Sequence, residues 1–472
     1  MAPKARQTLN AGAVAREREA RRAARRERAS ADQRVALALG MIDAVGARGY
    51  GKTTVGDVIE RAGLSRKTFY QHFANKQECF LATYDQISAR AILQVEQAYQ
   101  EAEGWPGRVE AAIRALFEAA IANPGAVRLV LIEINALGPA GIERRERSLV
   151  HYERFLRDAL KLAPGKGTFS DTVAKAVIGG LNSVLYRRVL RGERAKLLGV
   201  IPDLVTWFTS YYPTPAAMLA QPPVRKAVQR SRRLLEGGRA PGTFTPNASL
   251  NGRRGLPGGD HNFSRSYVVH SQRERILDAV ANLTAAQGYA ELTVEDIAEQ
   301  AAVSLQAFYE HFVDKEDAFL VAYEIGHARA LACAKRAYAT AGEWQLGVRA
   351  GLAALFDFLA EERSFAHLAL VDALVATART AERSNVGVAA FAKMLVPRVE
   401  EAPGQSAAPT ATVEAIAGGI FDLCLHYAFQ GRIGELPELV PSATYIALAP
   451  FVGSDAAAAV AIGSSARSTL AG

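Results

Sequence analysis

The chain repeats itself at an offset of 239 residues. Residues 49–84 read GYGKTTVGDVIERAGLSRKTFYQHFANKQECFLATY and residues 288–323 read GYAELTVEDIAEQAAVSLQAFYEHFVDKEDAFLVAY, with 16 of the 36 positions identical. The same register holds at Trp105 and Trp344, and again at Gly179-Gly180 and Gly418-Gly419, without insertion or deletion. A period this long predicts two copies of one domain of about 200 residues rather than a solenoid. Each copy is large enough to bury its own core.

The apolar spacing within each copy predicts an all-α fold. Apolar residues fall at helical intervals at Val55, Val58, Ile59 and Ala62, and alternating strand patterns are nearly absent. Further helices are predicted in copy 1 over residues 76–100, 108–123, 125–137, 143–162 and 170–191. Each copy is therefore expected to carry a three-helix N-terminal unit, here called the head, followed by a helical body.

Composition divides the chain further. We expect a basic disordered arm over 1–29, head 1 over 30–91, body 1 over 92–212, a Pro/Gly/Arg-rich linker over 213–266, head 2 over 267–330, body 2 over 331–452 and a flexible tail over 453–472. About 54 residues of flexible linker have an r.m.s. reach of roughly 40 Å, which allows neighbouring domains to pack in almost any orientation.

The charge of the chain is distributed unevenly. Lys+Arg minus Asp+Glu is 42 − 24 = +18 for residues 1–266 and 14 − 24 = −10 for residues 267–472, and residues 16–28 alone hold seven Arg. This balance indicates a polyanionic partner, first of all nucleic acid. In the arm, phosphate or minor-groove contacts are predicted for Arg21, Arg22, Arg25 and Arg26.

Other classes of protein find little support. No stretch of eighteen apolar residues occurs, the three Cys are far apart, and the eight His have no metal-ligand spacing. We therefore predict no membrane association, no cofactor, no metal and no enzymatic activity, and a cytoplasmic, nucleoid-associated location. The aromatic residues of the bodies fit an effector pocket or ordinary core, the latter at about four to one; they are Trp105, Phe117, Tyr152, Tyr186, Trp207, Trp344, Phe356 and Phe421.

A helix-turn-helix is predicted in each head. Thr54 and Asp57 form a capping pair for a helix ending near Ala62, and Thr293 with Asp296 repeats it. Gly63-Leu64 then breaks the helix, and Ser65 caps a second helix whose Phe69 and Phe73 face inward. The opposite side of this second helix carries Lys67 and Gln71, with Thr68 and Tyr70 on its flanks. Arg66 at its start and Lys76 at the next helix can reach phosphates.

These residues resemble the tetracycline-repressor (TetR) family of transcriptional regulators. Both copies show a Gly-Tyr, a Thr-capped helix, an Ala-Gly-like turn and a Ser-x-x-x-Phe-Tyr-x-His-Phe helix followed by Lys, over about 60 residues in each copy. The resemblance implies DNA-binding heads, and bodies that bind a small effector and dimerise as a four-helix bundle. The partners implied are a double-stranded DNA operator and a small-molecule effector.

The predicted DNA-binding residues of head 1 are Thr54, Ser65, Arg66, Lys67, Thr68, Tyr70, Gln71, His72 and Lys76. Those of head 2 are Thr293, Ser304, Gln306, Tyr309, Glu310, His311 and Lys315.

Head 2 departs from this pattern and is predicted to bind DNA more weakly. Residues 31–84 carry 7 − 5 = +2 charges, whereas the aligned residues 270–323 carry 3 − 10 = −7. Lys67 becomes Gln306 and Gln71 becomes Glu310, which repels phosphates. Ala302 replaces Gly63, at a cost of roughly 1 kcal/mol if the position needs a positive φ.

Fusion of two copies suggests an intramolecular pseudo-dimer. Two different heads in one chain can read a non-palindromic operator, because protein symmetry is mirrored in operator symmetry. The alternative is a homodimer of chains that pairs like copies on a palindrome.

Two other functions were weighed. Residues Gly46–Thr53 fit the phosphate-loop pattern G-x-x-x-x-G-K-[ST], which would indicate an ATPase, but such a loop must follow a buried strand and the aligned loop of copy 2 has no Lys. The third is a scaffold that holds nucleic acid through its basic arm without sequence preference.

Overall fold

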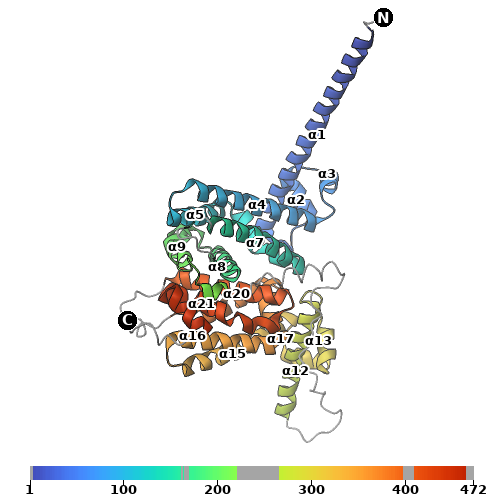
Figure 1. The fold of residues 1–472 in the computed structure, drawn as a ribbon. Helices are drawn as coiled ribbons and strands as arrows, with labels where there is room; N and C mark the ends of the chain where they lie inside the picture. Colours follow the sequence, from blue (N-terminus) through green and yellow to red (C-terminus); the bar gives the residue numbers. More distant parts are fainter. Residues whose placement is uncertain (1–3, 161–162, 164–168, 221–264, 397–408, 464–472) are drawn as a thin grey trace, which may run out of the picture. The chain divides into compact units, whose positions relative to one another are not determined.

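The computed structural model describes residues 4–160, 163, 169–220, 265–396 and 409–463. All regular structure in these ranges is helical, and the all-α prediction is confirmed. The chain divides into two compact units, one of residues 1–91 with 122–137 and the other of residues 92–121 with 138–472 (Figure 1). The first unit holds head 1, and the second holds the rest of copy 1 together with copy 2.

The first unit is built around the helix-turn-helix of copy 1. Its elements are α1 (Lys4–Arg48), α2 (Val55–Ala62), α3 (Arg66–His72), the start of α4 (Lys76–Glu101), α6 (Pro124–Leu131) and the 3₁₀ helix η1 (Glu133–Leu137). Its core includes Met41, Val58, Phe69 and Phe80, all fully buried. Phe69 and Phe73 face this core, as their four-residue spacing predicts.

The sequence predicts a disordered arm over residues 1–29. In the structure the described part of this segment is helical, and α1 runs without a break from Lys4 to Arg48. Figure 1 shows α1 extending well beyond α2 and α3. Residues 21–29 are exposed, so no core fixes this part of the helix. Its Ala, Arg and Glu residues are good helix formers, and this propensity favours helix where apolar periodicity gives no signal.

The second unit contains the helices of body 1 and of copy 2. For body 1 they are the remainder of α4, α5 (Trp105–Ala122), α7 (Pro139–Leu160), α8 (Asp171–Leu190), η3 (Arg194–Lys196), η4 (Leu198–Val200), α9 (Ile201–Thr209) and α10 (Ala216–Leu219). For copy 2 they are α12 (Arg265–Gln287), α13 (Val294–Ala301), α14 (Leu305–His311), α15 (Lys315–Thr340), α16 (Trp344–Glu361), α17 (Arg363–His367), η5 (Leu368–Asp372), α18 (Ala373–Val375), α19 (Ala378–Ala392), α20 (Thr410–Phe429), η6 (Ile433–Leu439), α21 (Val440–Val452) and α22 (Ser454–Ile462). The 239-residue offset therefore relates α4 to α15, α5 to α16 and α8 to α20 residue by residue.

Two predicted boundaries need correction. Residues 213–220, assigned to the linker, include α10, whose Met218 is fully buried and which contacts α21 and α22. The tail from 453 begins with α22, which buries Ala457, Ala458 and Ala461 against the neighbouring helices. Both segments are short or composed of small residues, so their burial depends on long-range packing that periodicity does not reveal. Residues 265 and 266, also assigned to the linker, begin α12. Residues 221–264 of the predicted linker and 464–472 of the predicted tail lie outside the described residues.

Helices α8 and α20 make the most extensive helix contact in the second unit, and α9 and α21 pack beside them. Glycines allow this close approach. A Cβ at Gly180 would lie 2.5 Å from the carbonyl oxygen of Ala415, and one at Gly419 would lie 2.4 Å from the carbonyl oxygen of Ala176. Because Gly419 aligns with Gly180 and Ala415 with Ala176, the two contacts are the same contact made reciprocally, as across a twofold axis.

Charged side chains are buried beside this glycine contact. Glu146 of α7 accepts hydrogen bonds from Lys175 of α8 at 3.1 Å and from His426 of α20 at 2.6 Å. Burial alone would raise the pKa of Glu146, but Lys175 and His426 outweigh it and hold that pKa below its ordinary value. Burial alone would lower the pKa of the Lys175 ammonium, but Glu146 and Glu153 outweigh burial and raise it. Glu146 and Lys175 are therefore both ionised at neutral pH.

Candidate nucleic-acid interface and apolar cavity

The turn of head 1 is held by two capped helices. The Thr54 hydroxyl accepts from the backbone N–H of Asp57 at 3.2 Å, and the Asp57 carboxylate accepts from the backbone N–H of Thr54 at 2.8 Å. Gly63 ends α2 with φ 63°, in the left-handed region. The Ser65 hydroxyl then caps α3 by accepting from the N–H of Thr68 at 3.1 Å. The capping pattern predicted from the sequence is present in the structure.

The outward face of α3 carries polar and basic side chains. Arg66, Lys67, Tyr70 and Gln71 are exposed, and Thr68 is half-buried at the edge of this face. Tyr70 is 51% exposed, and its ring meets the buried Phe69 ring edge-on, so the phenol points away from the core on a fixed support. Guanidinium, ammonium, amide and phenol groups on one short helix can hydrogen-bond phosphates and base edges.

Two predicted contact residues of head 1 are engaged within the head itself. The Lys76 ammonium donates to the carbonyl oxygens of Tyr50 at 2.9 Å and Thr53 at 2.8 Å, and lies 4.1 Å from the centre of the Tyr50 ring. His72 Nε2 lies 3.0 Å from Gln33 Oε1. Sequence reasoning missed these internal bonds, which fix α4 against the loop before α2 and α3 against α1.

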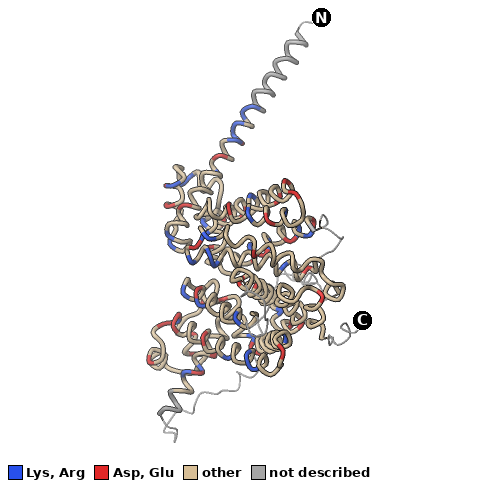
Figure 2. Tube along the Cα trace, turned by 90° about the vertical axis from the view of Figure 1, so that its left-hand side faces the viewer, with Lys and Arg blue, Asp and Glu red and all other residues tan. Residues whose placement is uncertain are grey.

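The basic residues of the arm lie on α1. Arg21, Arg22, Arg25 and Arg26 are exposed, and Figure 2 shows basic residues along the described length of the projecting helix. Because these residues lie on a helix, their guanidinium groups recur at helical spacing.

Head 2 reproduces the framework of head 1. The hydroxyls of Thr293 and Ser304 cap α13 and α14, each accepting at 3.1 Å from the N–H three residues on. Lys315 donates to the carbonyl oxygens of Tyr289 and Leu292 as Lys76 does to those of Tyr50 and Thr53. Its turn residue Ala302 is in the left-handed region at φ 50°, the conformation of Gly63.

The outward face of α14 differs from that of α3. Gln306 donates to Glu310 at 3.2 Å within the same helix, and both side chains are exposed. Leu305 and Tyr309 are 44% and 57% exposed, so an apolar side chain replaces the guanidinium of Arg66. His311 is half-buried, and burial lowers its pKa, which favours the neutral ring. Head 2 thus presents no cation from α14 toward a phosphate.

A buried carboxylate joins each head to the helices behind it, a feature that sequence reasoning missed. Glu133 accepts from the backbone N–H of Tyr50 at 2.8 Å and from the guanidinium of Arg128 at 3.0 Å. Asp372, at the aligned position, accepts from the backbone N–H of Tyr289 and lies 2.7 Å from His367 Nδ1. Glu133 and Asp372 stand at aligned positions, 239 residues apart, in segments that are otherwise apolar. This recurrence of an acidic residue was the sequence signal that could have identified them.

The phosphate-loop hypothesis lacks its structural context. Gly46 lies inside α1, which continues to Arg48, so a helix and not a strand precedes the Gly51-Lys52-Thr53 segment. Phosphate loops surround phosphates with amides between a strand and a helix.

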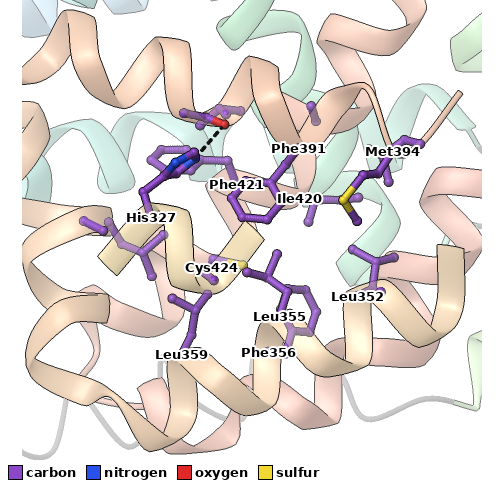
Figure 3. A pocket seen from close by; sticks show the side chains of 18 of the residues that line it. His327, Leu352, Leu355, Phe356, Leu359, Phe391, Met394, Ile420, Phe421 and Cys424 are labelled. Carbon is purple, nitrogen blue, oxygen red and sulfur yellow. Dashed lines mark hydrogen bonds between the residues drawn. The ribbon is translucent and has the colours of Figure 1, made fainter. Parts of the chain in front are cut away.

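Body 2 encloses an apolar cavity of about 100 Å³. Figure 3 shows Leu352, Leu355, Phe356 and Leu359 of α16 facing Ile420 and Phe421 of α20 across it, with Met394 and Phe391 at one side. None of its lining residues is Asp, Glu, Lys or Arg. The cavity therefore fits an uncharged molecule with a hydrocarbon surface.

Histidine 327 supplies a polar group at the edge of the cavity. Its Nε2 lies 3.1 Å from the carbonyl oxygen of Gly387, which is consistent with an N–H donor at this nitrogen. Burial lowers the pKa of His327, so the ring is neutral at neutral pH. One wall of the cavity is formed by Ala369 and Leu370 of the π-helical turn η5, which ends at Asp372. The same short segment therefore contacts both the cavity and the loop of head 2.

The predicted aromatic candidates separate into two groups. Phe356 and Phe421 line the cavity. Phe117, Trp207 and Trp344 are buried, Trp105 packs on Phe208 and Tyr212, and the Tyr186 hydroxyl lies 3.4 Å from Asn385 Nδ2. Tyr152 is half-buried on α7.

The described residues contain neither a membrane-spanning helix nor a metal-binding cluster. No described helix is long and apolar enough to cross a membrane. No group of three or more His, Cys, Asp or Glu in the described ranges is arranged to hold a metal ion.

Two capped helix-turn-helix heads, one with a basic and polar outward face, define a DNA-binding regulator. The family model described as "Bacterial regulatory proteins, tetR family" matches residues 43–83 and again residues 276–322, which are the two heads. The chain thus contains two tandem domains that match the tetR family model, and the resemblance stated from the sequence is confirmed for these two heads. Comparison with curated protein sequences gave no significant match. Among solved structures, the fatty acid degradation regulator FadR from Bacillus halodurans is similar over 37% of this chain and 94% of its own, at 15% identity and a TM-score of 0.34.

Proposed function

We propose that the chain is a sequence-specific transcriptional repressor that binds operator DNA chiefly through head 1. The observation that carries this proposal is the outward face of α3, where Arg66, Lys67, Tyr70 and Gln71 are exposed on a helix held by caps at both sides of the turn. Such a helix fits the major groove, whose base edges are read by these side-chain types. Arg21, Arg22, Arg25 and Arg26 of α1 add phosphate or minor-groove contacts.

Head 2 contributes less affinity in this proposal. The exposed Gln306 and Glu310 bond to each other, and the carboxylate of Glu310 repels phosphates. Head 2 retains Thr293, Ser304, Tyr309, His311 and Lys315, so we assign it a weaker contact and a role in setting the position of the chain on DNA.

The two copies of one chain pair with each other through α8 and α20. This part of the proposal is supported by the reciprocal glycine contacts, in which Gly180 meets Ala415 and Gly419 meets Ala176. One chain then presents two unlike heads, and its operator has two unlike half-sites. We place the protein in the bacterial cytoplasm, where its operator lies.

A small uncharged apolar molecule acts as the effector and binds body 2. The cavity supports this because no lining residue carries a full charge. Its wall includes the η5 turn, whose Asp372 holds the backbone of Tyr289, so a ligand that displaces η5 also shifts the loop of head 2.

Selection of random duplex DNA by the purified full chain at near-physiological salt tests the proposal. The expected product is a non-palindromic motif with one strongly and one weakly specified half-site. A palindrome would indicate chains that pair through like copies. Absence of any enriched sequence, with a steep salt dependence, would overturn specific regulation in favour of nonspecific binding through the arm.

A further inference from the structure

We propose that the charges buried between α8 and α20 make each copy recognise the other copy in preference to a second copy of itself. The inference rests on the intramolecular pairing proposed above and adds the reason why copy 1 pairs with copy 2 and not with another copy 1. The apolar and glycine contacts of the interface are shared by both copies, so they fit a like pair as well as an unlike one. The ionised residues are not shared.

The ion pairs of the interface join copy 1 to copy 2 with a fixed polarity. Glu414 of α20 accepts from Arg188 of α8 at 3.4 Å and from Arg191, the residue directly after α8, at 3.0 Å. Asp422 of α20 accepts from Arg145 of α7. The side chains of Asp422, Glu414 and Arg188 are 10% exposed or less, so water compensates little of their charge.

The residues at the aligned positions carry different charges. At the 239-residue offset, Glu414 of copy 2 corresponds to Lys175 of copy 1, and Asp422 corresponds to Ser183. On the other side of the pairs, Arg188 corresponds to Tyr427, Arg191 to Gln430 and Arg145 to Ser384. In these pairs copy 1 supplies the cations and copy 2 the carboxylates, whereas in the neighbouring contact Glu146 of copy 1 accepts from His426 of copy 2.

A pair of two copies 1 would bring like charges together. In that pair Lys175 takes the place of Glu414 and faces Arg188 and Arg191 of the other molecule. Arg145 faces Ser183 in place of Asp422. Lys175 keeps Glu146 and Glu153 of its own copy as partners, but it replaces a carboxylate beside the buried Arg188 and the half-exposed Arg191. These two arginines then face a cation, and like-charge contacts of this kind oppose association.

A pair of two copies 2 would leave carboxylates without cations. Glu414 then faces Tyr427 and Gln430, and Asp422 faces Ser384. A buried ionised carboxylate without a counter-charge is costly because it loses its hydration and gains no ion pair. Only the unlike pair places each of these carboxylates against an arginine.

The pairing of the separated copies tests this rule directly. A protease site is inserted between residues 221 and 264 of the full chain, the folded protein is cleaved, and the two fragments are examined by native mass spectrometry after dilution. We expect one complex with one fragment of each kind. Pairs of identical fragments at a comparable level would overturn the inference.

Charge reversals then assign the selectivity to the named residues. Glu414→Lys should weaken the fragment complex by roughly a hundredfold or more, because it places a third cation beside Arg188 and Arg191. Adding Arg188→Glu and Arg191→Glu should restore much of the binding, which a mere folding defect would not allow. The control is Glu382→Lys, which reverses an exposed charge on α19 and should leave the complex unchanged.

The outcomes separate this inference from the proposed function. If the uncleaved wild-type chain has the mass of two chains and selects a palindrome, intramolecular pairing fails. If the cleaved wild type gives the unlike complex but Glu414→Lys behaves like Glu382→Lys, the charge rule alone is overturned and the proposed pairing stands.

Discussion

Ala302 occupies the same left-handed backbone conformation as Gly63, with φ of 50° and 63° at the aligned turn positions of the two heads. An L-residue with a Cβ is strained there, whereas glycine is not. The turn of head 2 therefore keeps the geometry of head 1 despite a less suitable residue. Its caps at Thr293 and Ser304 and the bonds of Lys315 hold it in place.

The first prediction concerns this turn. Ala302→Gly should raise the stability of head 2 by about 1 kcal/mol, and Gly63→Ala should lower that of head 1 by a similar amount. Hydrogen exchange of the amides of α13–α14 and α2–α3 measures each head separately. No slowing of exchange in Ala302→Gly would show that Ala302 is unstrained.

The second prediction compares the outward faces of the two heads. Lys67→Ala should weaken operator binding by about 1 kcal/mol or more. If its ammonium contacts a phosphate, the slope of the logarithm of the binding constant against the logarithm of the salt concentration should also fall by about one. Gln306→Ala should have a much smaller effect, because Gln306 is bonded to Glu310 in its own helix. Equal losses in quantitative binding assays would show that both heads contribute alike.

The third prediction concerns Lys76. Its ammonium donates to two backbone carbonyls and lies over the Tyr50 ring, so Lys76→Ala should lower the unfolding free energy of head 1 by about 1–3 kcal/mol. Lys52→Ala is the control, since Lys52 is exposed in the same loop. Retained stability in Lys76→Ala, together with a reduced salt slope of DNA binding, would instead support a phosphate contact. Loss of tight ATP binding in Lys52→Ala would revive the phosphate-loop hypothesis.

The sequence was sufficient for the parts of the fold that depend on local interactions. The capping pair Thr54–Asp57, the cap Ser65 and the inward Phe69 and Phe73 follow from short-range geometry, and the structure contains each of them. The in-register repeat extended the same prediction to copy 2. These features required no knowledge of tertiary contacts.

Features that depend on long-range packing were missed. The internal bonds of Lys76 and the carboxylates Glu133 and Asp372 join segments far apart in the chain. Glu414 and Lys175 were not singled out from the sequence, because a charge on a helix usually indicates a solvated face. The opposite signs at these two aligned positions, in helices that are otherwise apolar, were the available signal of a buried interface.

The fourth prediction tests the cavity of body 2. The uncharged fluorophore N-phenyl-1-naphthylamine should bind there with enhanced emission, and Leu355→Trp should reduce this binding at least about tenfold by filling the cavity. Leu116→Trp, at the aligned position of copy 1, is the matched control and should retain the binding. A similar loss in both variants would place the probe elsewhere.

The fifth prediction concerns acid stability. The pKa of Glu146 is held below its ordinary value in the folded protein, mainly by Lys175 and His426 acting against burial. A depressed acid pKa stabilises the fold above the unfolded pKa, near 4.3, and this stabilisation is lost as the pH falls below that value. The raised pKa of Lys175 affects stability only at alkaline pH, because the stability from a raised pKa is fully present below the unfolded pKa of the ammonium.

The free energy of unfolding of the wild type, measured between pH 7 and pH 3, should therefore decline as the pH falls, and Glu146→Gln should flatten this decline. Glu110→Gln removes a half-exposed carboxylate paired with Arg114 and should leave the wild-type decline nearly unchanged, since exposed pairs contribute little. If the two variants gave the same pH profile, the buried cluster between α7, α8 and α20 would not control the acid stability of the protein.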